Sequence, residues 1–179
     1  MQKHFKICMM NTVRHLSKVL LVVTRLLAVS YGLTALYSFL CLITGWSLAF
    51  KDAGKYFLIL YPFTETPFLI GDNNIPYILF YFMLPLSLYG IFFWLAGNVF
   101  SVFTQDRLFT WNGVKQLKWF YSTNLFVPPV LILLTSLFSE VDESIILVVL
   151  HLFLGVFAFF LAAIFKQGLN LQNEQDLII

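Results

Sequence analysis

The side chain with the widest chemical range in this sequence is His151, which lies within an uninterrupted apolar stretch, residues 144–165. A histidine in such surroundings can accept a proton, bind a ligand, coordinate a metal or form a hydrogen bond to a neighbouring helix. Asn98 and Asn124, in two other apolar stretches, offer further hydrogen-bonding groups. We therefore take His151, Asn98 and Asn124 as candidates for ligand binding or sensing. A purely interhelical hydrogen bond of His151 is the alternative.

The residue pattern indicates neither a metal site nor a catalytic site. His4 and His15 lie in the amino-terminal segment, far along the chain from His151, and a metal ion needs several ligands together. Cys8 and Cys41 form no CxxC pair, and the sequence has no HExxH, GxSxG or glycine-rich phosphate-binding motif. We predict a protein that is not an enzyme and holds no metal or cofactor.

Four apolar stretches supply the elements that must position these side chains. They cover residues 26–46, 77–103, 119–138 and 144–165, and none contains Asp, Glu, Lys or Arg. About 20 apolar residues in a helix cross the ~30 Å hydrocarbon core of a bilayer. The sequence is 60% hydrophobic and has a mean hydropathy of +0.85. It therefore predicts an all-α fold, a single integral membrane domain built as a four-helix bundle in the lipid bilayer.

The basic residues indicate how this bundle is oriented. Nine of the eleven Lys and Arg residues lie in the amino-terminal segment, between the second and third spans, or directly after the fourth. Because basic residues concentrate on the cytoplasmic side of membrane proteins, we predict that both termini are cytoplasmic. The cytoplasmic parts then include an extension, 1–25, and a tail, 166–179. Arg14, Lys18 and Arg25 share one face of a helix in the extension, as anchors near lipid head groups.

The connection between the first two spans, residues 47–76, is external by the same argument. It is 30 residues long and apolar from Tyr56 to Phe63. Such a segment favours a short interfacial helix or a hairpin, which either packs on the membrane surface or covers a ligand pocket. Asn74, two residues before Pro76, is placed to cap the second helix.

Residues that bend helices or let them pack closely occur within the spans. Pro85 in the second span, and Pro128 with the proline after it in the third, remove backbone donors and predict kinks. Gly155, Ala158 and Ala162 place small residues on one face of the fourth span. This spacing predicts close helix packing at that face.

Two segments on the predicted cytoplasmic side carry the most specific patterns. The first, 106–118, reads DRLFTWNGVKQLK and resembles x-x-F-[ST]-x-x-N-V-x-x-L-[RK]. The second, 165–178, reads FKQGLNLQNEQDLI and resembles F-x-x-G-x-x-L-x-x-E-x-D-L-T-[IV]. With four spans in this order, the chain resembles the bacterial membrane family catalogued as domain of unknown function 2975.

Two positions depart from these patterns. Gly113 is an additional residue between Asn112 and Val114, and Ile178 stands where the pattern has threonine. The first departure bears on the start of the third helix, where Thr110 is placed as the N-cap. The second removes a hydroxyl group from the tail. Neither changes the predicted topology.

The resemblance implies a location in the bacterial cytoplasmic membrane but no established activity. Genes of this family often lie beside the gene of a small helix-turn-helix regulator. This implies a membrane component that senses a signal or tethers the regulator, without direct binding of nucleic acid by the chain itself. The candidate partner-binding residues lie in the two motif segments and are Arg107, Phe109, Asn112, Lys115, Leu117, Gly168, Leu171, Glu174, Asp176 and Leu177.

An alternative for the same segments is that loop and tail dock on each other and close the inner end of the bundle. The tail after Gly168 has leucines at 171 and 177 among polar residues. This pattern predicts a short amphipathic segment across that end, with Gly168 either ending the fourth helix or letting it bend.

Three functional hypotheses follow. The first is a sensory or regulatory membrane component that perceives a signal near the external connection and His151 and relays it to the cytoplasmic loop and tail. The alternative, a small transporter or channel-like subunit, predicts a water-lined path past Asn98, Asn124 and His151. A membrane enzyme is third and requires a cavity with convergent polar groups. The sequence leaves self-association into a homo-oligomer open.

Overall fold

Helices make up most of the computed structural model, which describes residues 2–136 and 144–176, with side chains for 11–136 and 145–175. The helices are α1 (Gln2–Thr44), α2 (Leu84–Val102), α3 (Trp111–Thr135) and α4 (Ser144–Asp176), and a π-helix, η1 (Tyr77–Met83), leads directly into α2. Within the described ranges, four helical segments are long and apolar enough to cross a membrane: Asn11–Thr44, Tyr77–Val102, Trp111–Thr135 and Ile145–Gln175. The predicted set of four membrane-spanning helices is confirmed in length and composition.

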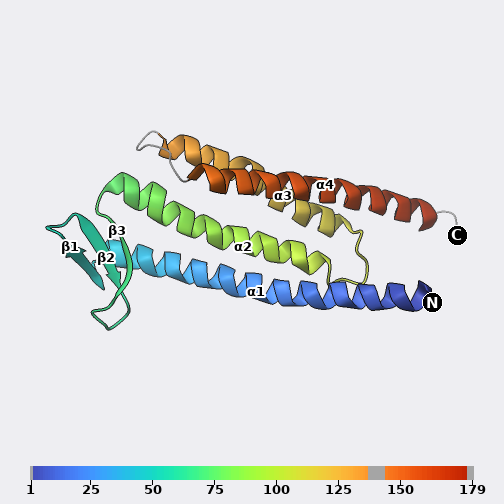
Figure 1. The fold of residues 1–179 in the computed structure, drawn as a ribbon, viewed down its shortest axis with the longest axis horizontal. Helices are drawn as coiled ribbons and strands as arrows, with labels where there is room; N and C mark the ends of the chain where they lie inside the picture. The colour runs from blue at the N-terminus through green and yellow to red at the C-terminus, as the bar shows by residue number, and fades with distance from the viewer. Residues whose placement is uncertain (1, 137–143, 177–179) are drawn as a thin grey trace.

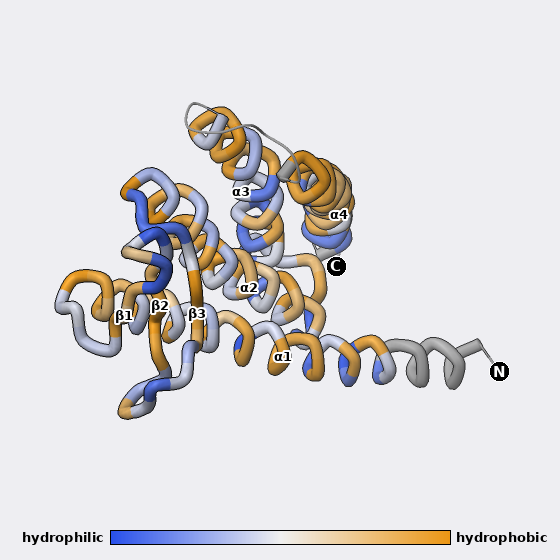
Figure 2. The backbone as a smooth tube through the Cα atoms, turned by 60° about the vertical axis from the view of Figure 1, so that its left-hand side comes forward, coloured by the Kyte–Doolittle hydropathy of each residue, from blue (hydrophilic) through white to orange (hydrophobic). Residues whose placement is uncertain are grey.

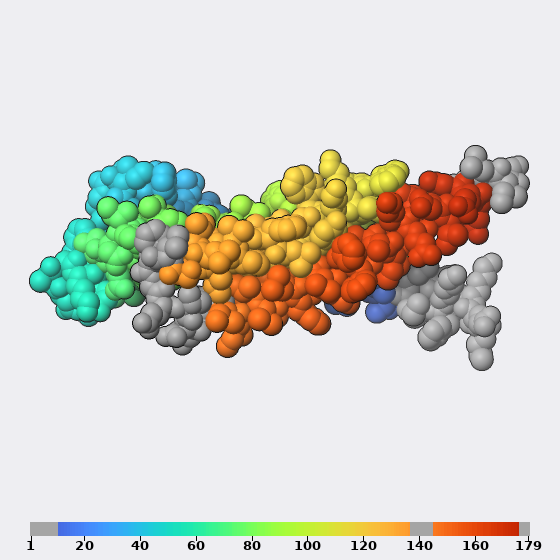
Figure 3. Space-filling model, turned by 90° about the horizontal axis from the view of Figure 1, so that it is seen from above, coloured from blue at the N-terminus to red at the C-terminus, as the bar shows by residue number. Residues whose placement is uncertain are grey.

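The four helices form two antiparallel pairs. α1 packs along α2 and α3 packs along α4, while contacts between α2 and α3 join the two pairs (Figure 1). The start of α1 and the described end of α4 lie at the same end of the bundle, which we name the terminal end. A small sheet lies at the opposite end, which we name the sheet end. Figure 3 shows the face on which α4 runs diagonally along α3.

The outer surface of the bundle suits a lipid environment. Hydrophobic residues follow most of the length of the helices, and hydrophilic residues gather in the turns of the sheet and at the end of α4 (Figure 2). Large apolar side chains such as Leu26, Ile43 and Phe153 are more than 60% exposed. In water such a surface would be a liability, whereas in a bilayer it meets hydrocarbon.

Small residues let α4 approach α3 closely. Ala158 and Ala162 are buried, and a Cβ atom added to Gly155 would lie 2.7 Å from Leu125 Cγ. Since real Cβ atoms do not come so close, only glycine fits there at this spacing of the helices. The predicted close packing along the Gly155 face is confirmed.

The expectation of an all-α chain is wrong in the connection between α1 and η1. This connection contains β1 (Leu48–Lys51), β2 (Tyr56–Leu60) and β3 (Pro67–Asp72), which form an antiparallel sheet in the order β1-β2-β3. Phe57 and Ile59 of β2 are fully buried and pack against the end of α1 around Cys41. Of the two predicted forms the hairpin was correct, extended by a third strand, and the interfacial helix was wrong.

Side-chain oxygens accept hydrogen bonds from the backbone at two helix starts, as predicted. Asn74 Oδ1 accepts a hydrogen bond from the Tyr77 N–H over 2.8 Å, and Thr110 Oγ1 accepts one from the Gly113 N–H over 3.0 Å. The additional residue Gly113 is buried, and a Cβ atom added there would lie 2.9 Å from Val102 Cγ1. The departure from the family pattern therefore fits a tight contact between α2 and α3.

The tail does not form a separate amphipathic segment. Residues 166–176 instead continue α4 without a break through Gly168. Gly168 has no left-handed backbone conformation that would end the helix, and its missing side chain gives room to Phe109, whose ring would lie 2.8 Å from an added Cβ. The glycine therefore serves packing rather than helix termination.

Candidate functional site

A cavity of about 300 Å³ is enclosed on three sides. One side is formed by η1 together with α2, the second by α3 and the third by α4. Its wall is predominantly apolar, as in most small-molecule sites, and its volume is at the lower end of the range for such sites. The polar residues in the wall come from all three sides of the cavity and are Tyr81, Tyr89, Thr123, Asn124, Thr135 and His151.

His151 and Asn124 form a hydrogen-bonded pair in this wall. His151 Nδ1 lies 2.7 Å from Asn124 Oδ1, and the Asn124 amide nitrogen donates a 2.8 Å hydrogen bond to the carbonyl of Phe120, one turn earlier in α3. Asn124 is only 1% exposed. The interhelical hydrogen bond predicted as the alternative for His151 is therefore present, and both of its residues line the cavity.

Aromatic rings and prolines shape the surroundings of this pair. The ring of His151 lies 5.1 Å from that of Phe92 and 6.1 Å from that of Tyr89, measured between centroids. Pro85 and Pro128 also line the cavity. Because Pro128 has no N–H, the carbonyl of Asn124 loses its usual helical partner four residues on. η1 adds widened π-helical turns, which are frequent at functional sites.

Asn98 does not belong to this cavity. It faces α1, where Arg25 donates hydrogen bonds to Asn98 Oδ1 over 2.5 Å and to the carbonyl of Trp94 over 3.2 Å. The Arg25 guanidinium also stacks on the Trp94 ring, 3.8 Å from its centroid. Asn98 lies six residues after Phe92, a rise of about 9 Å along α2. The structure thus brings together two of the three predicted sensing residues and assigns the third to the contact between α1 and α2.

Replacing Asn98 with Leu is expected to lower the free energy of unfolding by roughly 0.6–1.7 kcal/mol, the contribution of polar contacts between membrane helices. Leucine keeps the volume and removes the oxygen that accepts from Arg25. SDS-induced unfolding in mixed micelles measures the change. Asn170→Leu is the matched control, because Asn170 is exposed on α4. Equal destabilisation by both variants would contradict a specific contact.

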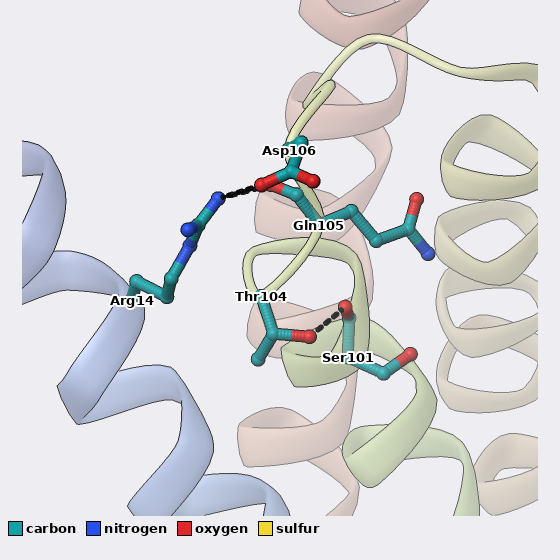
Figure 4. A network of polar contacts seen from close by, with 5 residues as sticks. All are labelled: Arg14, Ser101, Thr104, Gln105 and Asp106. Atoms are coloured by element: carbon teal, nitrogen blue, oxygen red, sulfur yellow. Dashed lines mark hydrogen bonds and ion pairs between the residues drawn. The ribbon is translucent and has the colours of Figure 1, made fainter.

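At the terminal end, the connection between α2 and α3 is tied to α1. Arg14 forms a 2.6 Å ion pair with Asp106 and donates to the carbonyl of Gln105 over 3.4 Å, while Thr104 donates to the Ser101 carbonyl over 2.8 Å (Figure 4). Asp106 is 95% exposed, so this ion pair adds little stability. It does hold the start of the first motif segment beside α1.

The two motif segments contact each other. The Phe109 ring lies 5.3 Å from that of Phe165 in an edge-on arrangement, and it fills the space beside Gly168. Leu117 is fully buried in the adjacent cluster with Val102 and Phe165. The predicted docking of loop and tail is present, and Phe109, Leu117 and Gly168 shape the terminal end from inside.

The other candidate partner-binding residues lie on the surface or beyond what the structure describes. Five of them are exposed, namely Arg107, Asn112, Lys115, Leu171 and Glu174. For Asp176 only the backbone is described, as the last residue of α4, and Leu177 lies outside the described residues. We name the five exposed side chains the terminal surface. They come from the connection between α2 and α3, from α3 and from α4.

Sequence reasoning missed the cavity and the role of Arg25. Arg25 was expected to act with Arg14 as an anchor near lipid head groups, yet both contact protein groups. A single sequence does not show how one helix is aligned with the next, so it contained no signal for the contact between Arg25 and Asn98. The sequence did contain a signal that Asn98 lies apart from the cavity. Asn98 follows the cavity residue Phe92 by six positions, which at about 100° per residue places it on a different face of α2.

Taken together, four apolar helices and an apolar cavity with a polar pair define a small multi-pass membrane protein. A family model described as a protein of unknown function (DUF2975) matches residues 9–179, and the chain belongs to this family. No curated protein and no solved structure gives a significant match.

Proposed function

We propose that this protein is a sensory or regulatory component of the bacterial cytoplasmic membrane, without enzymatic activity. A small apolar ligand enters the cavity beside His151 and Asn124. Its binding changes the position of α4 and thereby the terminal surface, where a small cytoplasmic helix-turn-helix regulator docks. Both termini lie in the cytoplasm.

The observation that supports this proposal most is the continuity of α4. The same helix supplies His151 to the cavity wall and Leu171 and Glu174 to the terminal surface. The 23 residues from 151 to 174 correspond to about 35 Å of unbroken helix. A rigid element that contacts both sites is a physical route by which a ligand biases a distant surface.

The transporter and enzyme hypotheses have less support from the positions of their candidate residues. A transport path was expected to pass Asn98, Asn124 and His151, and Asn98 is engaged with Arg25 on another face of α2. For an enzyme, the cavity offers amide, imidazole and hydroxyl groups, and His151 is oriented by an amide rather than by a carboxylate that would favour proton transfer.

A photo-crosslinking amino acid at position 171 tests the regulatory proposal in native membranes. Leu171 is 55% exposed on the terminal surface, and Phe160, 60% exposed on the same helix within the span, is the matched control. We expect a small helix-turn-helix protein to crosslink at 171 and lipid alone at 160. No protein partner at 171, or the same partner at both positions, would contradict the proposal.

The orientation is tested by labelling single cysteines on intact cells with a membrane-impermeant maleimide. In a Cys8→Ser background, where Cys41 is fully buried, Thr64→Cys lies in an exposed turn of the sheet and Asn173→Cys lies exposed near the end of α4. We expect position 64 to label and position 173 to remain unlabelled until the cells are lysed. The reverse result would overturn the argument from basic residues.

A further inference from the structure

The hydrogen bonds of Asn124 fix which nitrogen of His151 carries the proton. The Asn124 amide nitrogen already donates to the carbonyl of Phe120, so the amide oxygen faces His151 Nδ1 at 2.7 Å. An amide oxygen can only accept, and therefore Nδ1 must donate. In the neutral imidazole the second nitrogen, Nε2, then carries a lone pair and can only accept a hydrogen bond.

Nothing in the described part of the chain donates a hydrogen bond to Nε2 of His151. His151 is nevertheless part of the wall of a largely apolar cavity. Hydrocarbon offers Nε2 no hydrogen bond, whereas a ligand with a donor supplies one. The cavity therefore distinguishes molecules with an O–H or N–H group from those without one.

The surroundings of His151 also favour a flat, aromatic ligand. Phe92 meets the imidazole ring edge-on at an interplanar angle of 81°, and Tyr89 approaches it at 49°. Both rings come from α2, whereas the imidazole comes from α4. Aromatic groups placed edge-to-face against such rings gain additional stabilisation over aliphatic ones.

We infer that the cavity binds an apolar phenol-like or indole-like molecule, whose O–H or N–H group donates a hydrogen bond to His151 Nε2. This inference rests on the proposed function, since it names the class of ligand for the same cavity. The apolar body of the ligand lies between the aromatic side chains of η1 and α2 and the aliphatic side chains of α3 and α4. The Asn124 side chain acts as a positioning group, because it sets the tautomer and does not itself receive the ligand.

Two probes that differ in one hydrogen-bond donor test this inference on the full chain in lipid nanodiscs. They are para-propylphenol and its methyl ether, para-propylanisole. We expect the phenol to bind about five- to tenfold more tightly, the effect of one hydrogen bond. NMR of protein with isotope-labelled histidine gives a second readout, in which the phenol shifts the Nε2 signal of His151 and the ether does not.

His151→Phe is the matched variant, because it keeps an aromatic ring of similar size and removes Nε2. We expect it to bind both probes with equal affinity. The NMR comparison uses the native chain, so the test holds even if the variant folds poorly. Equal affinity of the native chain for both probes, or an unmoved Nε2 signal, would overturn the inference and leave the cavity as the sensing site. Binding of neither probe would overturn the inference and also remove the cavity from the proposed function.

Discussion

A Gly168→Ala variant is expected to lower the free energy of unfolding by roughly 1–3 kcal/mol, the cost of forcing an extra group into a packed site. The added Cβ would lie 2.8 Å from two atoms of the Phe109 ring and 2.9 Å from a third. The ring must move, and with it the connection between α2 and α3, which carries Arg107 of the terminal surface. SDS-induced unfolding in mixed micelles measures the change.

Gly32→Ala is the matched control for this substitution. Gly32 also lies within a long helix, but a Cβ atom there meets no atom within 4 Å. Both variants gain the same helix propensity, about 1 kcal/mol, so their difference isolates the collision with Phe109. A second change, Phe109→Leu, is expected to restore much of the stability of Gly168→Ala by making room for the methyl group. Equal effects at positions 32 and 168, or no restoration, would refute the contact as the cause.

The membrane-spanning helices were predictable because lipid imposes a strong rule on composition. A stretch of about 20 apolar residues without charge is typical of a membrane-spanning helix. The four predicted stretches match the observed helical segments, and none extends beyond its segment by more than a few residues. Helix starts were also predictable where a side chain acts on its own backbone. Asn74 and Thr110 cap their helices through contacts three residues on, which depend on local sequence alone.

The sheet was harder to predict because its central strand hides the usual alternation. All five residues of β2, Tyr56–Leu60, are apolar, although only Phe57 and Ile59 are fully buried. The other three are partly buried, so no polar residue marks the less buried face of the strand. Period-two analysis has nothing to detect in such a strand.

The cavity depends on alignment between helices, which local patterns do not contain. The contact of His151 with Asn124 depends on the close packing of α4 on α3. Gly155, one helical turn after His151, permits this packing because it contacts Leu125 of α3 without a side chain. The sequence indicated the residues that form this contact, namely a histidine and an asparagine in separate spans and a glycine on one helix face. Only the packed structure shows that these residues lie at the same level along the helix axes. The tail followed the same rule, since the sequence left Gly168 either to end the fourth helix or to let it bend, and gave no sign of its contact with Phe109.

Leu117→Ala is expected to be the most destabilising of the proposed changes, at about 2–5 kcal/mol, because it leaves a cavity in a packed cluster. Leu117 is fully buried against Val102 and Phe165, although its place in a motif segment made it a candidate for partner binding. Leu171, from the other motif segment, is 55% exposed, and its replacement by Ala is expected to change stability by less than about 0.5 kcal/mol.

The two leucines therefore separate structural from binding roles within the motifs. With the crosslinking amino acid moved to the exposed position 174, Leu171→Ala is expected to weaken crosslinking to the regulator while the unfolding transition stays unchanged. Leu117→Ala is expected to weaken crosslinking only as far as the folded fraction falls, because its side chain never reaches the surface. If Leu171→Ala left crosslinking intact, the tail would act only as the part of α4 that holds Phe109 in place, and the regulator would have to bind elsewhere on the terminal surface.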